Sequence, residues 1–201
     1  MLLVRHGMTP TTGKLLPGRA PGLRLSETGR AQADRVASGI AALDPQPVAV
    51  YASPLERARE TAAPIARALG VRVRTERGLV ELDIGDWTGT SLARARRRHE
   101  WGAVQRWPSG FAFPGGESFA QLVARTTETV ARLVRMHPGQ TIVAVSHADP
   151  IRALVSTAAG IPLDLFQRLV VSTASVSAVQ YAPDGPRVVC VNASAEGLVR
   201  S

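Results

Sequence analysis

Apolar residues along the chain follow two alternating spacings. Short apolar runs, of the kind that form buried strands, lie at 1–5, 47–52, 71–74 and 141–145. Between these runs, apolar residues recur every three or four positions, as on one face of a helix, over about 27–43, 54–69, 118–136 and 148–157. Because strands that alternate with helices form mostly parallel sheets with helices on both faces, the pattern predicts a three-layer α/β/α fold.

The last part of the chain has another pattern. Residues 173–181 and 186–192 are rich in residues that favour strands, and they flank the turn Pro183-Asp184-Gly185. Two such runs around a turn predict a hairpin, and therefore an antiparallel edge to the sheet.

Two stretches have no clear period. Residues 6–26 are rich in glycine and proline, which predicts a long loop, and long loops inside compact domains are often functional. Residues 75–117 predict a loop to about 89, a polar helix near 90–100 and an irregular stretch after it.

Two predicted helices begin with capping signals. Ser53 precedes Pro54, with Glu56 three positions after the serine, and Ser118 has Gln121 at the same spacing. In such a capping box the serine and the acidic or amide side chain satisfy backbone N–H groups at the helix start. We therefore expect capped helices to begin at these two serines.

The composition fits one domain of 201 residues with a sizeable core, since 45% of the residues are hydrophobic and 20% are charged. No apolar run reaches the ~18 residues of a membrane span. The apolar residues 1–4 are followed at once by Arg5, too short for a signal peptide, so a cytoplasmic location without a membrane partner is predicted. Cys190 is the only cysteine, which excludes an internal disulfide and a cysteine metal cluster.

The formal net charge of +8 has two interpretations, an anionic partner such as nucleic acid or a bias toward arginine. Lys14 is the only lysine, the basic residues are spread along the chain, and the run 96–98 falls in a predicted helix. Aromatic residues make up 4% of the chain, few for stacking on single strands. We therefore favour the arginine bias and predict no nucleic-acid partner.

Three polar groups follow predicted strands. Arg5-His6 follows the first strand, Ser53 to Arg57 follows the second, and Ser146-His147 follows the strand at 141–145. Ligands of such sheets bind beyond the carboxyl ends of the strands. The sequence therefore predicts that these groups meet at one site.

The residue types suit phosphoryl transfer. A neutral imidazole such as that of His6 is a nucleophile near neutral pH, and the forks of Arg5 and Arg57 can each hold two phosphate oxygens. Gly7 would allow close backbone approach or a positive φ. Taken alone, each group also has a purely structural explanation, such as a hydrogen-bonded core histidine or a surface arginine.

A departing alkoxide needs a proton. Glu81, Asp83 and Asp86 lie in one acidic loop and are the candidate donors, although such a loop can equally carry solvated acids.

In this order the motifs resemble the histidine phosphatase superfamily, with its phosphoglycerate-mutase-like fold. The similarity runs from residue 3 to about residue 155. Its main stretches are Leu3-Val4-Arg5-His6-Gly7, Ser53-Pro54-Leu55 with Arg57-Ala58, Glu81 with Gly85 and Trp87, Pro114-Gly115-Gly116-Glu117-Ser118, and Val145-Ser146-His147.

The resemblance implies roles for particular residues. His6 would carry the phosphoryl group, Glu81 would donate the proton, and Arg5, Arg57 and His147 would complete the phosphate pocket. It further implies substrate contacts by Thr9, Arg19 and Ala148, no metal, no cofactor, and a cap at about 88–116 that chooses the substrate within a single domain over 1–201.

The chain departs from the family pattern at Met8, Thr12, Thr88 and Ala148-Asp149. These departures leave the phosphate chemistry in place and open the choice of substrate. Asp149 could read a substrate group or cap the following helix, and we favour the cap.

Three functions remain open. A phosphatase acting on a small phosphorylated metabolite is favoured over a mutase, because only residues 82–116 separate Glu81 from Glu117 and mutases of the family carry a larger insertion. A non-catalytic module that binds a phosphorylated ligand is the third. The oligomeric state is open, and a homodimer is one alternative.

Overall fold

The computed structural model of the chain describes residues 1–194 and 197. Its strands are β1 (Leu2–Arg5), β2 (Ala49–Ala52), β3 (Val73–Thr75), β4 (Ile142–Ser146), β5 (Val176–Ala182) and β6 (Gly185–Ala193). Its α-helices are α1 (Glu27–Ala41), α2 (Glu56–Ala68), α3 (Leu92–Ala95), α4 (Trp101–Arg106), α5 (Phe119–Met136) and α6 (Ala148–Ala158). Short 3₁₀ turns lie at Arg77–Leu79, Gly85–Trp87, Pro108–Gly110 and Leu163–Arg168.

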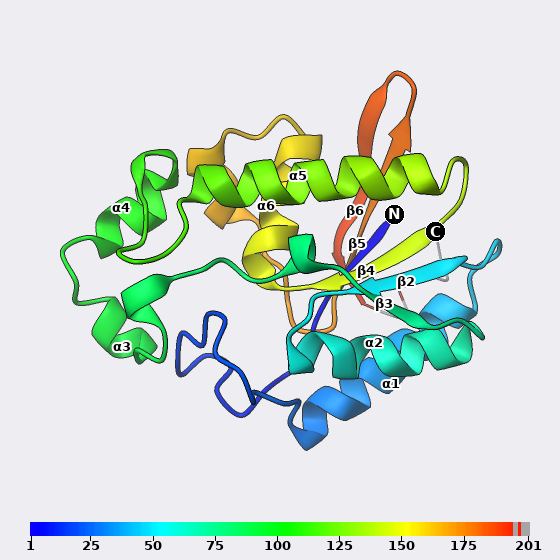
Figure 1. Cartoon of the computed structure of the whole chain (residues 1–201), viewed down its shortest axis with the longest axis horizontal. Coiled ribbons are helices and arrows are strands. Elements are labelled where there is room, and N and C mark those ends of the chain that lie inside the picture. The colour runs from blue at the N-terminus through cyan, green and yellow to red at the C-terminus, as the bar shows by residue number, and fades with distance from the viewer. Residues whose placement is uncertain (195–196, 198–201) are drawn as a thin grey trace.

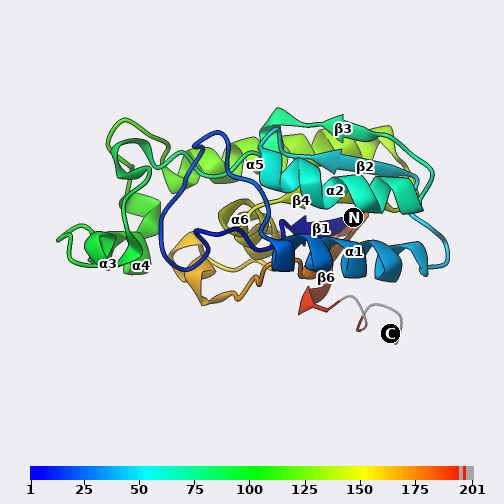
Figure 2. The same cartoon turned by 90° about the horizontal axis from the view of Figure 1, so that it is seen from below.

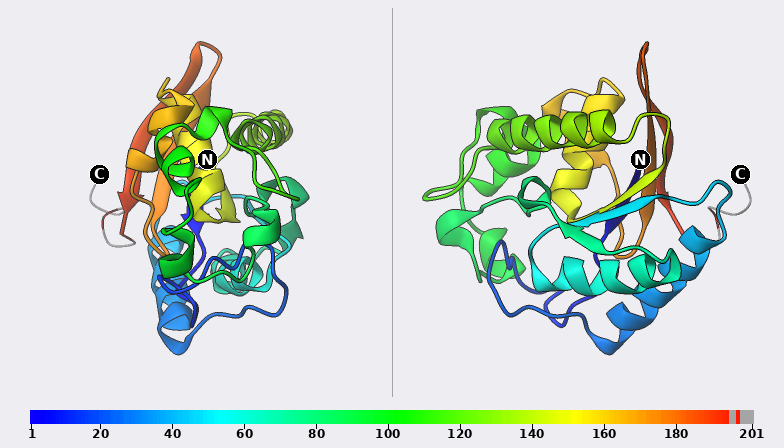
Figure 3. Two further views of the ribbon diagram at one scale, coloured as in Figure 1. Left: turned by 90° about the vertical axis from the view of Figure 1, so that its left-hand side faces the viewer. Right: turned by 45° about the vertical axis from the view of Figure 1, so that its right-hand side comes forward.

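The six strands form one sheet in the order β3-β2-β4-β1-β5-β6. Strands β1, β2, β3 and β4 run parallel, whereas β5 pairs antiparallel with both β1 and β6. The mostly parallel sheet and its antiparallel edge confirm the predicted fold class. Figure 3 shows the β5–β6 hairpin extending past the layer of helices, which agrees with the hairpin prediction.

Alternate residues of the strands enter two separate cores. Leu2 and Val4 belong to a cluster with residues of α1 and α2, whereas Leu3 belongs to a cluster with residues of α5 and α6. Figure 1 shows these two pairs of helices on opposite faces of the sheet. The uninterrupted apolar strands therefore follow from burial on both faces.

Residues 88–116 lie at one end of the molecule, where Figure 2 shows α3 and α4 beside each other. The polar helix predicted near 90–100 is present only as the short α3 at Leu92–Ala95, and a second short helix, α4, occupies Trp101–Arg106 in the stretch predicted to be irregular. Ala95 and Trp101 both join the apolar cluster around Trp87, but residues six apart point to different sides of one α-helix. The chain must therefore turn between them.

The two capping predictions have opposite outcomes. Ser118 and Gln121 form the predicted capping box of α5. The box at Ser53 is wrong, because α2 begins at Glu56 and its N-cap Leu55 makes no side-chain cap. The Ser53 hydroxyl instead contacts His147, as described below.

The loop at 6–26 is tied to the region at 88–116. Leu15 forms an isolated bridge with Ser91, and the Leu92 N–H donates to the Lys14 carbonyl at 2.9 Å. The loop and the start of α3 are therefore joined by backbone hydrogen bonds. Within the described residues, every helix is too short or too polar to cross a membrane.

Candidate active site

Strands β1, β4 and β2 are neighbours, so their carboxyl ends bring three side chains together as the sequence predicts. The His6 N–H donates to the Ser146 carbonyl at 3.0 Å, and the Ser53 N–H donates to the Val145 carbonyl at 3.0 Å. The rings of His6 and His147 then lie edge to face with centroids 5.1 Å apart.

The His6 ring is held in one orientation. Its Nδ1 lies 2.8 Å from the Gly7 carbonyl oxygen, which can only accept, so Nδ1 carries the proton and Nε2 keeps its lone pair. Burial, together with the charges of Arg57 and Arg5, lowers the pKa of His6 to about 3. The ring is therefore neutral over the whole physiological range of pH.

Gly7 serves close approach rather than a positive φ. A Cβ at Gly7 would lie 2.5 Å from the Gly29 carbonyl oxygen, in the first turn of α1. The Gly7 N–H also donates to the Thr61 hydroxyl at 3.0 Å. These contacts seat the turn after β1 on α1 and α2, and so fix the carbonyl that orients His6.

Arg5 and Arg57 reach the same site, and each has guanidinium N–H groups that make no hydrogen bond to the described residues. Arg57 is 1% exposed, and its Nη2 donates to the Gly18 carbonyl at 2.8 Å. Arg5 donates from Nη1 to the Val171 carbonyl at 2.6 Å. Among the described residues, Nε of both arginines and Nη1 of Arg57 are buried without a partner. Buried cationic donors of this kind suit the oxygens of a phosphate group.

His147 is the N-cap of α6 and is fully buried. Its Nε2 lies 2.7 Å from the Ser53 hydroxyl, and its Nδ1 has no partner within residues 1–194 and 197. Burial, with the nearby charges of Arg57 and Arg5, holds the pKa of His147 well below its ordinary value. If the Ser53 hydroxyl donates to Nε2, then Nδ1 carries the proton and can donate to an anion.

Ser53→Ala is expected to lower turnover roughly tenfold. The variant loses one hydrogen bond, worth about 1.4 kcal/mol, and without it the proton of His147 is no longer held on Nδ1. The measurement is kcat/KM for p-nitrophenyl phosphate. Ser156→Ala is the matched control, since Ser156 is also a buried serine but its hydroxyl has no partner in the described chain. Equal activities of the two variants would contradict the role of the Ser53 hydroxyl.

Glu81 is the candidate acid that lies close enough to Arg57 and Arg5 to interact with their charges. Its Oε1 accepts from the Leu82 N–H at 2.9 Å, and burial together with the charge of Asp149 raises the pKa of Glu81 to about 7. Asp83 pairs with Arg19 instead, and Asp86 is exposed. Of the three candidate donors, Glu81 alone therefore combines a neighbouring cationic pocket with a pKa suited to giving up a proton near neutrality.

The other predicted substrate contacts differ in what they offer. Thr9 is buried, with its hydroxyl 3.0 Å from that of Thr12. Ala148 is the first residue of α6, where backbone N–H groups have no partner within the helix and attract anions. The N-cap is His147, so the capping prediction for Asp149 is wrong, and Asp149 pairs with Arg152 at 3.0 Å.

Arg19 is engaged by the protein itself. Its Nε, Nη1 and Nη2 donate to the Glu81 carbonyl, the Asp83 carboxylate and the Glu117 carboxylate at 2.8, 3.2 and 2.9 Å. The geometry therefore does not support Arg19 as a phosphate contact. It makes Arg19 a support for the segment that carries Glu81.

Three further side chains at this site have no site role in the interpretation of the sequence. Glu117 lies in the quoted stretch Pro114–Ser118 without an assigned role, and Arg125 looks like any charged residue of a helix. The spacing of Ser53 and Glu56 predicts a helix cap for the Ser53 hydroxyl rather than a contact with His147. Within the described residues, no group of three or more His, Cys, Asp or Glu side chains could hold a metal ion.

The family model of the histidine phosphatase superfamily (branch 1) matches residues 1–194. The chain belongs to this superfamily. Among solved structures of the superfamily, a mycobacterial glucosyl-3-phosphoglycerate phosphatase in complex with VO₃ is 29% identical, with a TM-score of 0.87 over 96% of this chain and 99% of that one.

Curated relatives in the superfamily are also similar. Phosphoserine phosphatase 1 of Hydrogenobacter thermophilus is 32% identical over 89% of this chain and 85% of its own length. A bifunctional protein of Mycobacterium tuberculosis is 35% identical over 92% of this chain, which spans 51% of that protein's length. The chain thus spans about half the length of this bifunctional protein, but most of the length of the phosphoserine phosphatase.

Proposed function

We propose that the chain is a phosphatase that hydrolyses small phosphate monoesters through a phosphohistidine on Nε2 of His6. The observation that carries the proposal is the His6 ring, which is neutral, buried and fixed through Nδ1 beside the spare donors of Arg5 and Arg57. A nucleophile with a free lone pair next to buried cations is what phosphoryl transfer requires.

In the first step Nε2 of His6 attacks phosphorus and the bond from phosphorus to the ester oxygen breaks. Glu81 gives its proton to the departing oxygen. In the second step the Glu81 carboxylate takes a proton from water, the hydroxide attacks phosphorus, and the bond to Nε2 breaks. Phosphate leaves, and both His6 and Glu81 return to their starting states.

Positive charge for both steps would come from the protein. Arg5, Arg57, the Nδ1–H of His147 and the N–H of Ala148 would donate to the three non-bridging oxygens, on which negative charge is spread. The proposal therefore includes turnover without a metal. Its test is hydrolysis of p-nitrophenyl phosphate with EDTA present, followed by release of phosphate from a panel of natural esters that includes 3-phosphoglycerate and its bisphosphate.

The relatives named as phosphatases support hydrolysis over a mutase reaction. The leaving group would lie toward Asp149 and residues 88–116, where a cavity of about 150 Å³ is lined by Trp101, Phe113, Asp149 and Arg152 among others. Its size favours a small phosphorylated metabolite. We propose that 88–116 is a cap that chooses the substrate within a single domain. The cytoplasmic location stays a prediction of the sequence, and the oligomeric state stays open.

Glu81→Gln is expected to slow hydrolysis of an alkyl ester such as glycerol 2-phosphate by about 10²-fold or more, because the alkoxide leaves poorly without a proton. It should slow p-nitrophenyl phosphate much less, since nitrophenolate is stable without one. The measurement is kcat/KM for both esters. Equal losses would argue against Glu81 as the donor.

The pH profile gives a second check. Because the pKa of Glu81 is raised to about 7, its protonated form is present below that pH and is lost as pH rises through it. Wild-type hydrolysis of glycerol 2-phosphate should therefore fall above about pH 7. Glu81→Gln serves as the reference, since it keeps the titration of the ester itself and lacks that of the donor.

A further inference from the structure

The backbone that carries Glu81 is held by side chains at four consecutive carbonyl groups. Arg125 Nη1 donates to the carbonyls of Gly78 and Val80 at 2.7 and 3.0 Å. The Ser146 hydroxyl donates to the Leu79 carbonyl at 2.6 Å, and Arg19 Nε donates to the Glu81 carbonyl at 2.8 Å. An extended segment in a sheet would be held by backbone partners, whereas this one depends on three side chains from separate parts of the chain.

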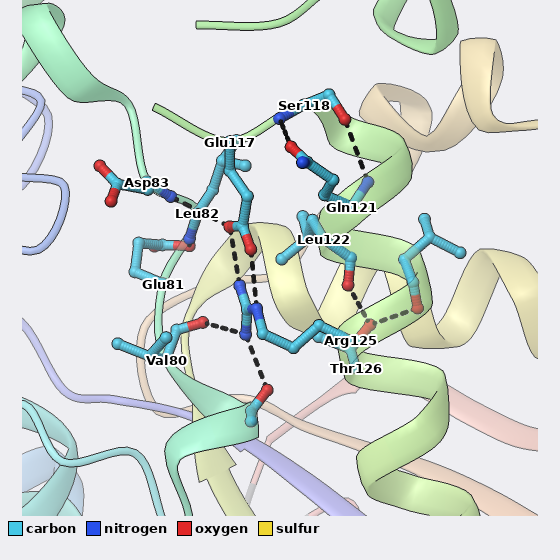
Figure 4. A network of polar contacts seen from close by, with 12 residues as sticks. Val80, Glu81, Leu82, Asp83, Glu117, Ser118, Gln121, Leu122, Arg125 and Thr126 are labelled. Carbon is cyan, nitrogen blue, oxygen red and sulfur yellow. Dashed lines mark hydrogen bonds and ion pairs between the residues drawn. The ribbon is translucent and has the colours of Figure 1, made fainter. Parts of the chain in front are cut away.

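Both arginines meet at one carboxylate. Glu117 accepts from Arg125 Nε and Nη2 at 2.8 and 2.9 Å, and from Arg19 Nη2 at 2.9 Å. Figure 4 shows the paired contacts between Arg125 and Glu117, and the contact between Arg125 and Val80. Glu117 therefore orients the two guanidinium groups that hold three of the four carbonyls.

Glu117 also makes direct contacts with Asp83, at the other end of the segment 78–83 that carries Glu81, here called the acid segment. Its Oε2 accepts from the Asp83 N–H at 3.3 Å, and its own N–H donates to the Asp83 carbonyl at 2.8 Å. A Cβ at Gly116 would lie 2.5 Å from that carbonyl oxygen, so this approach depends on glycine. The stretch Gly116-Glu117 is thus packed against the acid segment.

The electrostatics keep this arrangement charged. The Glu117 side chain is 14% exposed, and those of Arg19 and Arg125 are 32% and 22% exposed. Burial opposes ionisation of Glu117, but the hydrogen bonds and charge of Arg125, with the Asp83 N–H and Arg19, lower its pKa overall. The carboxylate is therefore ionised at the pH at which the phosphatase would work.

We propose that Glu117 is a positioning residue for the proton donor: through Arg19 and Arg125 it fixes the backbone of residues 78–83, and so sets where the Glu81 carboxyl lies relative to the phosphate pocket. This inference rests on the proposed function, in which Glu81 is the acid. Ser146 adds a direct link, since its hydroxyl holds the same segment and it precedes His147.

The test is Glu117→Gln, which keeps the size of the side chain and removes the charge that orients both arginines. The readout is the ratio of kcat/KM for glycerol 2-phosphate to kcat/KM for p-nitrophenyl phosphate. The ratio is unaffected by the amount of folded enzyme, so simple destabilisation cannot lower it. We expect the ratio to fall about 10–100-fold, because a donor misplaced by about 1 Å loses this much.

Three further variants sharpen the result. Glu81→Gln already removes the proton donor. The double variant Glu81→Gln with Glu117→Gln should therefore have the same ratio as Glu81→Gln alone. Arg125→Lys keeps a charge but not the fork that reaches Glu117 and two carbonyls, and should lower the ratio as Glu117→Gln does. Glu60→Gln is the matched control: Glu60 also binds an arginine and a backbone N–H, but at Arg24 and Leu25.

The outcomes separate the inference from the function on which it rests. If Glu81→Gln leaves the ratio unchanged, the acid assignment fails. If Glu81→Gln lowers it but Glu117→Gln and Arg125→Lys do not, the positioning role fails. A further drop in the double variant, or an equal drop in Glu60→Gln, would also overturn the positioning role.

Discussion

Replacing His6 with alanine is expected to lower turnover of p-nitrophenyl phosphate on the order of 10⁴-fold or more. The reason is the arrangement at the end of β1, where Nε2 of a neutral imidazole faces two buried arginines. Alanine leaves the cations in place and removes the atom that forms the bond to phosphorus. His147 is the other histidine described at the site, and its Nε2 is already engaged by the Ser53 hydroxyl at 2.7 Å, so it does not replace His6 as the nucleophile.

The measurement is hydrolysis from pH 4 to 8 with EDTA, beside His137→Gln as the control. His137 follows α5, away from the carboxyl ends of the strands, and contacts Tyr51. Because the pKa of His6 is lowered to about 3, the wild type should not lose its nucleophile by protonation anywhere in this range. Activity of His6→Ala near that of the wild type would remove the basis of the proposed function.

Replacing Arg57 with methionine should have two effects of opposite sign. The value of kcat/KM is expected to fall about 10³-fold, as for other groups that stabilise charge in the transition state. The free energy of unfolding without ligand is expected to rise by about 1–2 kcal/mol, because a buried guanidinium with two unpartnered nitrogens gives way to an apolar side chain of similar length.

Thermal unfolding with and without inorganic phosphate measures the second effect. Phosphate should raise the Tm of the wild type by binding the folded state, and should raise that of Arg57→Met far less. Arg59→Met is the matched control, since Arg59 lies two positions away on the exposed side of α2. A phosphate shift that is equal in all three proteins would show that Arg57 does not hold the anion.

The positions of several site residues could be predicted, because these residues directly follow strands of the parallel sheet. His6 and His147 follow strands that the apolar runs identify, and parallel neighbours end at the same edge of a sheet. The position of Arg57 could be predicted from the same pattern, because Arg57 lies in the first turn of α2, the helix that follows β2. The proposed phosphate pocket thus depends on local sequence and on fold class together.

The parts that escaped prediction depend on contacts between distant segments. Ser53 has the spacing of a cap, and only the proximity of β2 and β4 gives its hydroxyl to His147, 94 positions away. Arg19 looks like a free cation until Glu117 and Asp83 are seen beside it. The break between α3 and α4 likewise depends on where Trp87 lies.

The tie between the loop at 6–26 and α3 has a practical use in spectroscopy. Lysine and arginine total 24 residues, yet Lys14 carries the chain's one side-chain amine, and it is exposed beside the Leu15–Ser91 bridge. A fluorophore attached there through an amine-reactive ester would sit next to residues 88–116, and peptide mapping would separate this product from labelling at the α-amine of Met1, which donates to the Val179 carbonyl at 2.8 Å. A change in its emission on addition of inorganic phosphate would show that the surroundings of Lys14 and α3 respond to an anion in the site, whereas constant emission would show that they do not.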